Sequence, residues 1–525
     1  MYYGDCLDWM GEWDDESVDL IYLDPPFNSK ANYNVLYGTE GSSEAQYRAF
    51  EDTWHWDDKA EDRLVMFESA IGRPAHNAIE GLFRILGRSG MLAYLTYMAE
   101  RLEHMHRLLK PSASLYLHCD PTASHYLKVV LDAIFGPQGF RAEITWQRTS
   151  SHNDGAQGRR EYGHICDVIL FYTRGTKWSW NRQYMSYDQQ YTDRFYRHIE
   201  EGSGRRYQLG DLTGPGGAAK GNPIYEVMGV TRYWRYSQER MQQLIDAGRV
   251  IQTAPGRAPR YKRYLDEMPG KPLQDLWTDI KPIGAHAKER LGYPTQKPLA
   301  LLERIIKASS NEGDLVLDPF CGCGTAVEAA QRLGRQWAGI DISPFAIDLI
   351  KKRRLRDPSI PTLGIPLDLT SARKLARERP FDFESWAVTR LPGFIPNMKQ
   401  VADGGVDGRA TLARKPDNYD SRLALAQVKG GSFQLGALRD FIRVADRDKA
   451  AVGCFVTLDP INSRAARSEA ASVGRIYISD SGQLRYEYPR VQLWSIRDYF
   501  EERPLRLPIM ADPYTGKVMS QQAMF

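Results

Sequence analysis

The 525-residue sequence has no long apolar run, few cysteines and little net charge. A helix that crosses a bilayer needs about 20 consecutive apolar residues, so we expect no membrane role. The first residues, Met1–Asp5, show neither the basic region nor the apolar segment of an export signal, which favours a cytoplasmic protein. The six cysteines include no C-x-x-C pair, which disfavours a zinc site or redox centre. The net charge of +3 neither requires nor excludes a nucleic-acid partner, because a polyanion responds to local basic patches.

The length and the order of the expected elements favour several α/β domains. At roughly 100–200 residues per domain, the chain has room for about three units. Residues 18–23 form an apolar, β-prone run that predicts a buried parallel strand ending at a turn. This alternation of helices and strands is typical of a doubly wound α/β sheet, whose ligands bind at the carboxyl ends of the strands. The further helices and strands are expected at residues 92–109, 114–118, 121–135, 142–147, 168–172, 299–309, 315–317, 325–333 and 337–340.

From about Trp178 to Ile280 the alternation gives way to a region rich in glycine, tyrosine and arginine. Arginine lies beside aromatic residues in four short runs, at residues 194–198, 205–207, 232–236 and 260–264. Guanidinium groups bind phosphates and aromatic rings stack on bases, so this composition favours a DNA-contacting insert over an irregular solvated surface.

Residues 315–325 combine a strand, a turn with two glycines and the start of a helix. Glycines let the backbone approach a ligand closely, and a helix N-terminus presents unpaired N–H groups. Asp341 ends the next expected strand, where an acidic side chain of a Rossmann-like unit accepts hydrogen bonds from ribose hydroxyls. Glu328 stands where a dinucleotide fingerprint would have its third glycine. The pattern therefore favours a nucleoside without a pyrophosphate, such as S-adenosylmethionine, over NAD.

Three ordered motifs resemble those of the N6-adenine and N4-cytosine DNA methyltransferases: DPPF at residues 24–27, YPTQKP at 293–298 and DPFCGCGT at 318–325. Their order is similar to that of the permuted beta group, and the resemblance covers residues 1–355. It implies a Rossmann-like methyltransferase sheet that uses S-adenosylmethionine. The catalytic loop that it implies consists of Asp24, Pro25, Pro26 and Phe27. The cofactor-binding residues that it implies are Gly4, Asp5, Thr295, Lys297, Asp318, Phe320, Gly322, Gly324, Thr325 and Asp341.

The DPPF loop also suits the chemistry of amine methylation. An exocyclic amine is a poor nucleophile because its lone pair is delocalised into the base, so its nitrogen must be held near tetrahedral geometry. The Asp24 carboxylate and the Pro25 carbonyl can each accept one N–H, and the two prolines make the loop rigid. Phe27 would stack on a base rotated out of the duplex. Adenine N6 is the preferred target and cytosine N4 the alternative, and the transfer itself needs no metal.

A second group of polar residues follows residue 370. Glu384 lies in an expected helix, Asp407 in a glycine-rich turn, and Gln427 and Lys429 on one face of an expected strand. The turn and the Gln-x-Lys strand resemble the Mrr-like branch of the PD-(D/E)xK restriction nucleases over residues 379–460. By this resemblance Asp407 holds Mg²⁺ and Lys429 orients the attacking water, with Gln427 in the second-acid position and Glu384 as a supporting acid. The alternatives are an ordinary α/β domain and a nuclease fold that only binds DNA.

The expected function is a site-specific DNA adenine methyltransferase with a fused nuclease-like domain, in restriction-modification or phage defence. The sequence leaves open a cytosine N4 enzyme, and a DNA-binding module whose methylase centre is inactive. The partner is double-stranded DNA, and the sequence leaves open a homodimer or additional restriction or defence subunits. The expected segments are a catalytic half at 1–177, a target-recognition insert at 178–281, a cofactor half at 282–355, a linker at 356–378 and a restriction-endonuclease-like α/β domain at 379–525.

Overall fold

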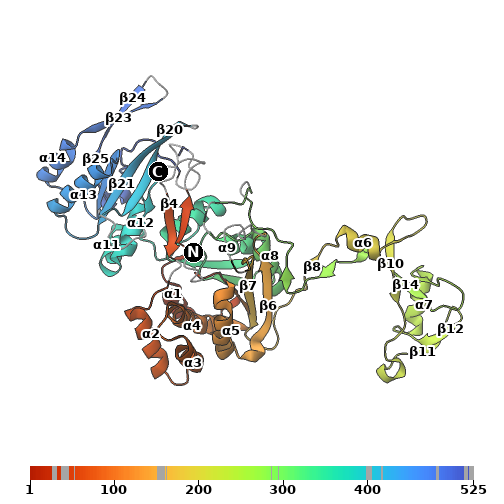
Figure 1. Ribbon diagram of the computed structural model, residues 1–525. Coiled ribbons are helices and arrows are strands. Elements are labelled where there is room, and N and C mark those ends of the chain that lie inside the picture. The colour runs from red at the N-terminus through yellow and green to blue at the C-terminus, as the bar shows by residue number, and fades with distance from the viewer. Residues whose placement is uncertain are drawn as a thin grey trace. The chain divides into compact units, whose positions relative to one another are not determined.

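The fold was analysed in a computed structural model (Figure 1). It divides into two compact units, residues 1–181 with 275–525 and residues 182–274, which are called unit 1 and unit 2 below. The structure describes, at least for the backbone, residues 1–26, 32–36, 46–51, 54–150, 160, 162–284, 287–291, 293, 295–397, 405–415, 418–480, 484–512 and 518–519.

Unit 1 contains an eight-stranded sheet in the order β1-β18-β17-β2-β5-β7-β6-β16. The first five strands in this order, which are β1, β18, β17, β2 and β5, are parallel to one another. Strand β7 is antiparallel to both β5 and β6. The expected α/β sheet is confirmed, and it is mixed because β7 reverses direction. Its strands are β1 (Tyr2–Tyr3), β2 (Val18–Leu23), β5 (Leu109–Cys119), β6 (Phe140–Gln147), β7 (Cys166–Thr173), β16 (Leu276–Trp277), β17 (Leu315–Asp318) and β18 (Gln336–Asp341).

The helices of this sheet begin at capping residues that the sequence makes recognisable. Ser89 caps α4, and Asp120 caps α5 with Pro121 in the first turn. The apolar faces of both helices pack into the core against β2, β5 and β7. The helices are α1 (Cys6–Glu12), α2 (Asp58–Ser69), α3 (His76–Leu86), α4 (Gly90–Leu108), α5 (Pro121–Phe135), α8 (Leu299–Ser309), α9 (Thr325–Arg332) and α10 (Pro344–Leu349), with the short elements η1 (Pro137–Gly139), η5 (Ile350–Arg354), β3 (Asn32–Leu36) and β4 (Gln46–Glu51).

The described residues from 369 onward contain a second sheet within unit 1, in the order β19-β20-β21-β22-β25. Helix α11 belongs to its core through Ala372 and Leu375, so residues 369–378, which were expected to be part of a linker, are packed structure. The strands are β19 (Ile395–Pro396), β20 (Gly408–Lys415), β21 (Asn418–Lys429), β22 (Val452–Thr457) and β25 (Val491–Ser495), beside the pair β23 (Arg475–Asp480) and β24 (Leu484–Pro489). The helices are α11 (Leu369–Glu378), α12 (Pro380–Val388), α13 (Leu435–Arg447), α14 (Arg464–Ser472) and α15 (Ile496–Phe500).

Unit 2 contains a four-stranded sheet, β13-β14-β10-β9, and a hairpin of β11 and β12. Its core includes Trp234, while Tyr196, Tyr207 and Tyr264 are also buried. These aromatic residues belong to the runs that the sequence assigned to DNA contact. They are buried within unit 2, because so small a sheet needs large apolar side chains to form a core. The elements are β8 (Tyr184–Met185), α6 (Gln189–Phe195), β9 (His198–Ile199), β10 (Arg206–Asp211), η3 (Gly217–Lys220), β11 (Ile224–Val227), β12 (Val230–Tyr233), α7 (Gln238–Asp246), β13 (Val250–Ile251), β14 (Arg260–Tyr264), η4 (Leu265–Glu267) and β15 (Lys271–Pro272).

None of the helices that the structure describes has the length and apolar character needed to span a membrane.

Candidate active site

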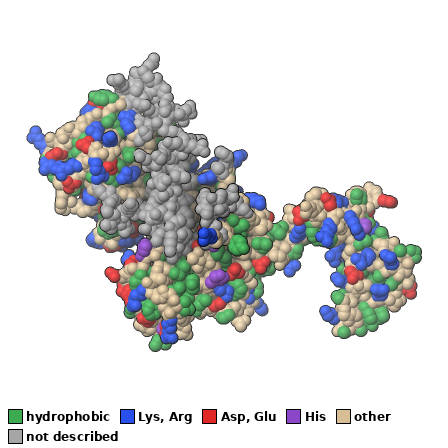
Figure 2. Space-filling model, in the orientation of Figure 1, with side chains coloured by type: hydrophobic (Ala, Val, Ile, Leu, Met, Phe, Trp, Pro, Cys, Tyr) green, Lys and Arg blue, Asp and Glu red, His purple; other side chains and the backbone are tan. Residues whose placement is uncertain are grey.

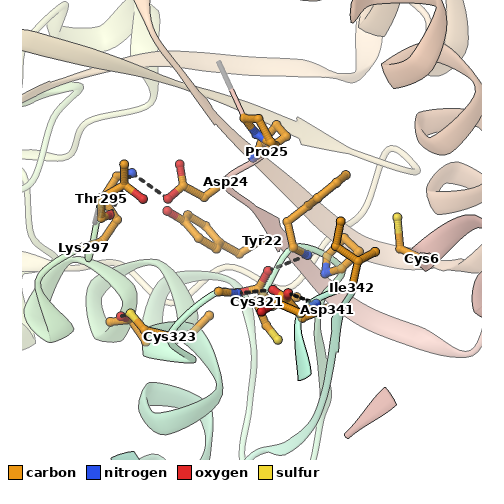
Figure 3. A pocket seen from close by; sticks show the side chains of 18 of the residues that line it. Cys6, Tyr22, Asp24, Pro25, Thr295, Lys297, Cys321, Cys323, Asp341 and Ile342 are labelled. Carbon is orange, nitrogen blue, oxygen red and sulfur yellow. Dashed lines mark hydrogen bonds and ion pairs between the residues drawn. The ribbon is translucent and has the colours of Figure 1, made fainter. Parts of the chain in front are cut away.

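A pocket opens at the carboxyl ends of β1, β2, β17 and β18 (Figure 3). The lining brings together segments from the beginning and the end of residues 1–355 at one edge of the sheet. Of the site residues predicted in this part, Phe27 lies outside the described residues, and Gly324 is not among the residues that line the pocket. The sequence-predicted residues that line the pocket are Gly4, Asp5, Asp24, Pro25, Pro26, Thr295, Lys297, Asp318, Phe320, Gly322, Thr325 and Asp341.

Asp24 follows β2 and forms an ion pair with Lys297, whose Nζ lies 2.6 Å from Oδ2 of Asp24. The Lys297 side chain is 9% exposed, so the pair is largely shielded from water. The other carboxylate oxygen, Oδ1, is buried and has no hydrogen-bond partner among the described residues. An unsatisfied buried acceptor costs about 1–3 kcal/mol. The site therefore lacks a donor at Oδ1, and an incoming N–H group would supply one.

Asp341 ends β18 and has both of its carboxylate oxygens fixed by backbone donors. Gly322 donates its N–H to Oδ2 and Ser343 donates its N–H to Oδ1, each at 2.8 Å. Burial raises the pKa of Asp341 to about 6, although the two N–H groups oppose this effect. Each oxygen keeps a second lone pair, so Asp341 can still accept hydrogen bonds from two ligand hydroxyls.

The pocket carries more carboxylates than cations. Asp318 accepts the Phe320 N–H at 3.1 Å, and no lysine or arginine in the described part of the chain forms an ion pair with it. Burial, and then the negative charges of Asp24 and Asp341, raise the pKa of Asp318 well above its ordinary value. Lys297 is the cation that offsets these charges within the lining. A cationic ligand would therefore be favoured here.

The glycine turn is held in place by a buried arginine. Arg354 donates to the Cys323 carbonyl and forms an ion pair with Glu328 at 2.6 Å. Gly324 has a φ of +74°, and a Cβ there would lie 2.6 Å from Ile350. The absence of a side chain at Gly324 thus permits the turn and the packing of Ile350, and the residue does not approach the pocket itself. Glu328, which replaces the third glycine of a dinucleotide fingerprint, anchors Arg354.

Residues 18–352 match the protein family described as DNA methylase, which is more than half of the chain. The chain belongs to this DNA methylase family.

Curated relatives are similar to part of the chain. The type II methyltransferase M.EcaI of Enterobacter cloacae is 34% identical over 266 residues, which are 50% of this methylase and 57% of the relative. The StyLTI Mod subunit, a type III restriction-modification enzyme of Salmonella typhimurium, is 26% identical over 62% of this methylase and 48% of the relative. The chain spans about half the length of these two relatives. The DNA adenine methyltransferase YhdJ of Escherichia coli is 23% identical over 67% of this methylase and 81% of the relative.

Several lining residues of the methylase pocket were not predicted from the sequence, among them Tyr22 and Tyr97. Tyr22 lies within the apolar run of β2, where the pattern indicates only a core residue. Tyr97 and Arg101 are one helical turn apart on α4, and the Arg101 guanidinium lies 3.3 Å from the centre of the Tyr97 ring. Arg101 also binds the Asp5 carboxylate at 2.6 Å. A buried arginine on the apolar face of a helix was the signal that could have indicated this pair.

The second polar group of the methylase lies in its C-terminal sheet. Asp407 precedes β20, and its Oδ2 accepts the N–H of Val428 at 2.7 Å, so its carboxylate lies beside the end of β21. On β21, Gln427 is buried with no partner for its Oε1 among the described residues, and Lys429 is partly exposed. Glu384 lies on α12, which packs against β21. Residues 375–486, which include all four side chains, match the family described as restriction endonuclease.

Proposed function

We propose that the chain is a DNA amino-methyltransferase that transfers a methyl group from S-adenosylmethionine to adenine N6. The observation that carries the proposal is the buried Oδ1 of Asp24, which has no hydrogen-bond donor among the described residues and lies in a pocket whose charges favour a cation. The exocyclic amine would supply the donor. The name of YhdJ, a DNA adenine methyltransferase, supports adenine over cytosine as the target base.

The lining residues suit S-adenosylmethionine, which carries an activated methyl group on a cationic sulfur when it is bound. Asp341 would accept the ribose hydroxyls with its two fixed oxygens. Asp318 forms no ion pair with a described lysine or arginine, and its carboxyl would face the positive charge of the ligand. Gly322 lines the pocket beside the Asp341 carboxylate and has no side chain that would fill the space for the ligand. The donor set thus matches the hydroxyls and charges of such a nucleoside.

At the transfer site, Asp24 would hold the target nitrogen. Oδ1 accepts one amine N–H and the Pro25 carbonyl accepts the other, which localises the nitrogen lone pair toward the methyl group. Lys297 fixes the Asp24 side chain through Oδ2 and leaves Oδ1 for the base. Phe27, outside the described residues, retains its proposed stacking role. No metal takes part in this reaction.

Unit 2 is the proposed DNA-recognition part, and its arginines fall into two groups. Figure 2 shows lysine and arginine side chains among acidic ones on its visible face. Arg205 and Arg249 are engaged by Glu267, and Arg205 also binds Asp266. A second group is exposed and forms no ion pair with any described residue, so it is free to bind phosphates. This group includes Arg197, Arg232, Arg257 and Arg263.

For the C-terminal sheet we propose a Mg²⁺-dependent nuclease that acts with the methyltransferase in restriction-modification. The described residues contain no group of three or more His, Cys, Asp and Glu side chains that could hold a metal ion. Mg²⁺ usually keeps several water ligands and binds through one or two carboxylates, so Asp407 with the unpartnered Oε1 of Gln427 fits it. Lys429 would orient the attacking water. The name of the StyLTI relative, a restriction-modification Mod subunit, supports such a role, alone or with further subunits.

Asp24→Ala is expected to slow methyl transfer by at least about 100-fold, because it removes the acceptor that positions the amine. Binding of S-adenosylmethionine, measured by calorimetry, is expected to persist. Asp19→Ala is the matched control, because Asp19 lies on β2, the strand that precedes Asp24. It pairs with Lys110 at 2.8 Å and does not line the pocket. Equal methylation rates for the two variants would remove Asp24 from the mechanism.

The affinity for S-adenosylmethionine is expected to fall as the pH drops through about 6. The pKa of Asp341 is raised to about 6, so its carboxyl is ionised above that pH and accepts both ribose hydroxyls. Below it, protonation removes an acceptor, and affinity falls by up to about tenfold per pH unit. Calorimetric titrations between pH 5 and 8 in the parent and in Asp341→Asn test this. A variant that keeps the parent's pH dependence would contradict the assignment of Asp341.

Replacing Arg232 and Arg263 by Ala is expected to weaken DNA binding at all sequences. The slope of log affinity against log salt is expected to fall by about one for each phosphate that the protein no longer neutralises. Arg205→Gln serves as the control, because its guanidinium is already occupied by Asp266 and Glu267. The measurement is fluorescence anisotropy of a labelled duplex over a salt series. If the double variant and the control show the same slope as the parent, the residues that bind phosphate lie elsewhere.

The purified chain is expected to cut plasmid DNA with Mg²⁺ and to be inactive with chelator, and the methylation state of the plasmid is expected to govern cutting. Lys429→Ala is expected to abolish cleavage because the attacking water loses its positioning charge. Lys374→Ala, at an exposed position of α11, should leave cleavage unchanged. The assay compares methylated and unmethylated plasmid. If neither is cut, or if Lys429→Ala cuts as well as the parent, the domain serves DNA binding alone.

A further inference from the structure

A row of buried polar side chains leads away from the pocket across three neighbouring strands, β2, β5 and β7. The Tyr22 hydroxyl lies 3.0 Å from Nδ1 of His118, and Nε2 of His118 lies 3.1 Å from Oδ2 of Asp167. Arg148, at the end of the row, places its Nε 3.2 Å from Oδ1 of Asp167. The sheet order β2-β5-β7 makes the row continuous.

The row connects the pocket to solvent. Tyr22 lines the pocket and is 2% exposed, His118 is fully buried, and the Arg148 side chain at the far end is 46% exposed. Burying polar groups at the centre of a sheet is unfavourable unless every one is paired, and apolar side chains would fill the same space at less cost. The three paired polar groups in this core therefore indicate a functional role in addition to packing.

The protonation states along the row follow from Asp167. Burial acts to raise the pKa of Asp167, but the hydrogen bond from His118 and nearby positive charges, among them those of Lys297 and Arg148, outweigh it and lower the pKa. Asp167 is therefore ionised and accepts the Nε2–H of His118. This fixes the tautomer in which Nδ1 has a lone pair, so the Tyr22 hydroxyl donates to His118. The oxygen lone pairs of Tyr22 are then left for the pocket.

Tyr22 lies beside the proposed transfer site. It lies on β2 two residues before Asp24, which directly follows the strand, and both residues line the pocket. Figure 3 shows its ring next to the Asp24 carboxylate. Burial, and then the charge of Asp24, raise the pKa of Tyr22 well above its ordinary value. The Lys297 ammonium group donates to Oδ2 of the Asp24 carboxylate.

We propose that the Tyr22–His118–Asp167 row takes up the proton that the base amine must lose on methylation. The proposal rests on the methyltransferase function proposed above. As the N–C bond forms from the nitrogen lone pair, the C–S bond breaks and its electrons remain on sulfur. The amine, now cationic, gives one proton to the Tyr22 oxygen, directly or through one water, while Tyr22 passes its own proton to Nδ1 of His118. The products are a neutral methylamine, a neutral Tyr22 and a His118 imidazolium stabilised by Asp167. Once the product has left, the proton returns through the Tyr22 hydroxyl to water in the pocket.

The kinetic test compares Tyr22→Phe and His118→Gln with the parent in single turnovers. Both variants are expected to lower the rate by about 100-fold, with unchanged calorimetric affinity for S-adenosylmethionine, and added imidazole should restore part of the rate by accepting the proton. The matched control is Tyr116→Phe on the neighbouring strand β5. It removes a buried hydroxyl that forms a 2.7 Å hydrogen bond with Ser309 of α8. A Tyr22→Phe rate within about threefold of this control, or a loss that imidazole leaves unchanged, would overturn the proposal.

The tautomer of His118 provides a test that does not depend on activity. Nitrogen-15 spectra of histidine-labelled protein, assigned with the His118→Gln variant, are expected to show a proton on Nε2 and none on Nδ1. A proton on Nδ1 overturns the row even in a protein that methylates DNA. A parent that fails to methylate any DNA, with His118 in the expected tautomer, would instead reject the methyltransferase function.

Discussion

The ion pair between Asp24 and Lys297 is the interaction on which the rest of the site depends. Its partners lie 273 residues apart, and unit 2 is inserted between them. Asp24 follows β2, and Lys297 lies just before α8, which packs against α9 and against β5, the strand next to β2. A buried charge that loses its partner costs several kcal/mol. Any arrangement that separated the two halves would therefore leave Asp24 or Lys297 unpaired, and this ties the fold to the geometry of the pocket.

The repeating elements were predictable because their signals are local. The helices at residues 121–135 and 299–309 were expected with the bounds that the structure gives them, since Asp120 with Pro121 marks one start and Pro298 precedes the other. The pocket motifs were also predictable, because short loops between a strand and a helix carry glycine and proline in fixed order. Residues 369–378 were expected to belong to a linker, and the structure has helix α11 there. Their apolar positions are separated by arginine and lysine, and only the packing of Ala372 and Leu375 on the C-terminal sheet reveals them as core.

Other features depend on contacts that a linear pattern does not contain. In unit 2 the arginine-aromatic runs were expected to contact DNA as a whole, yet Trp234 and Tyr207 are buried while Arg232 is exposed. The strand pairing decides which residues of a run face the core, as where Tyr207 of β10 lies opposite Tyr264 of β14. Lys297 was assigned to the cofactor by its motif, and the structure places its ammonium on Asp24. In both cases the residue type was informative, but its partner was fixed by the tertiary fold.

Tyr22 and His118 show most clearly why sequence patterns miss such residues. Both lie in apolar strands, where the sequence pattern predicts only that an aromatic or histidine side chain belongs to the core. Their distinguishing property is that each buried polar atom meets a partner on the next strand, which depends on strand order and register across β2, β5 and β7. A sheet that needed only stability would place apolar groups there. Instead, buried polar groups stand at the carboxyl end of β2. They are the Tyr22–His118–Asp167 row and Oδ1 of Asp24, which has no hydrogen-bond partner among the described residues. A reacting amine would donate a hydrogen bond to Oδ1 and release a proton to the row.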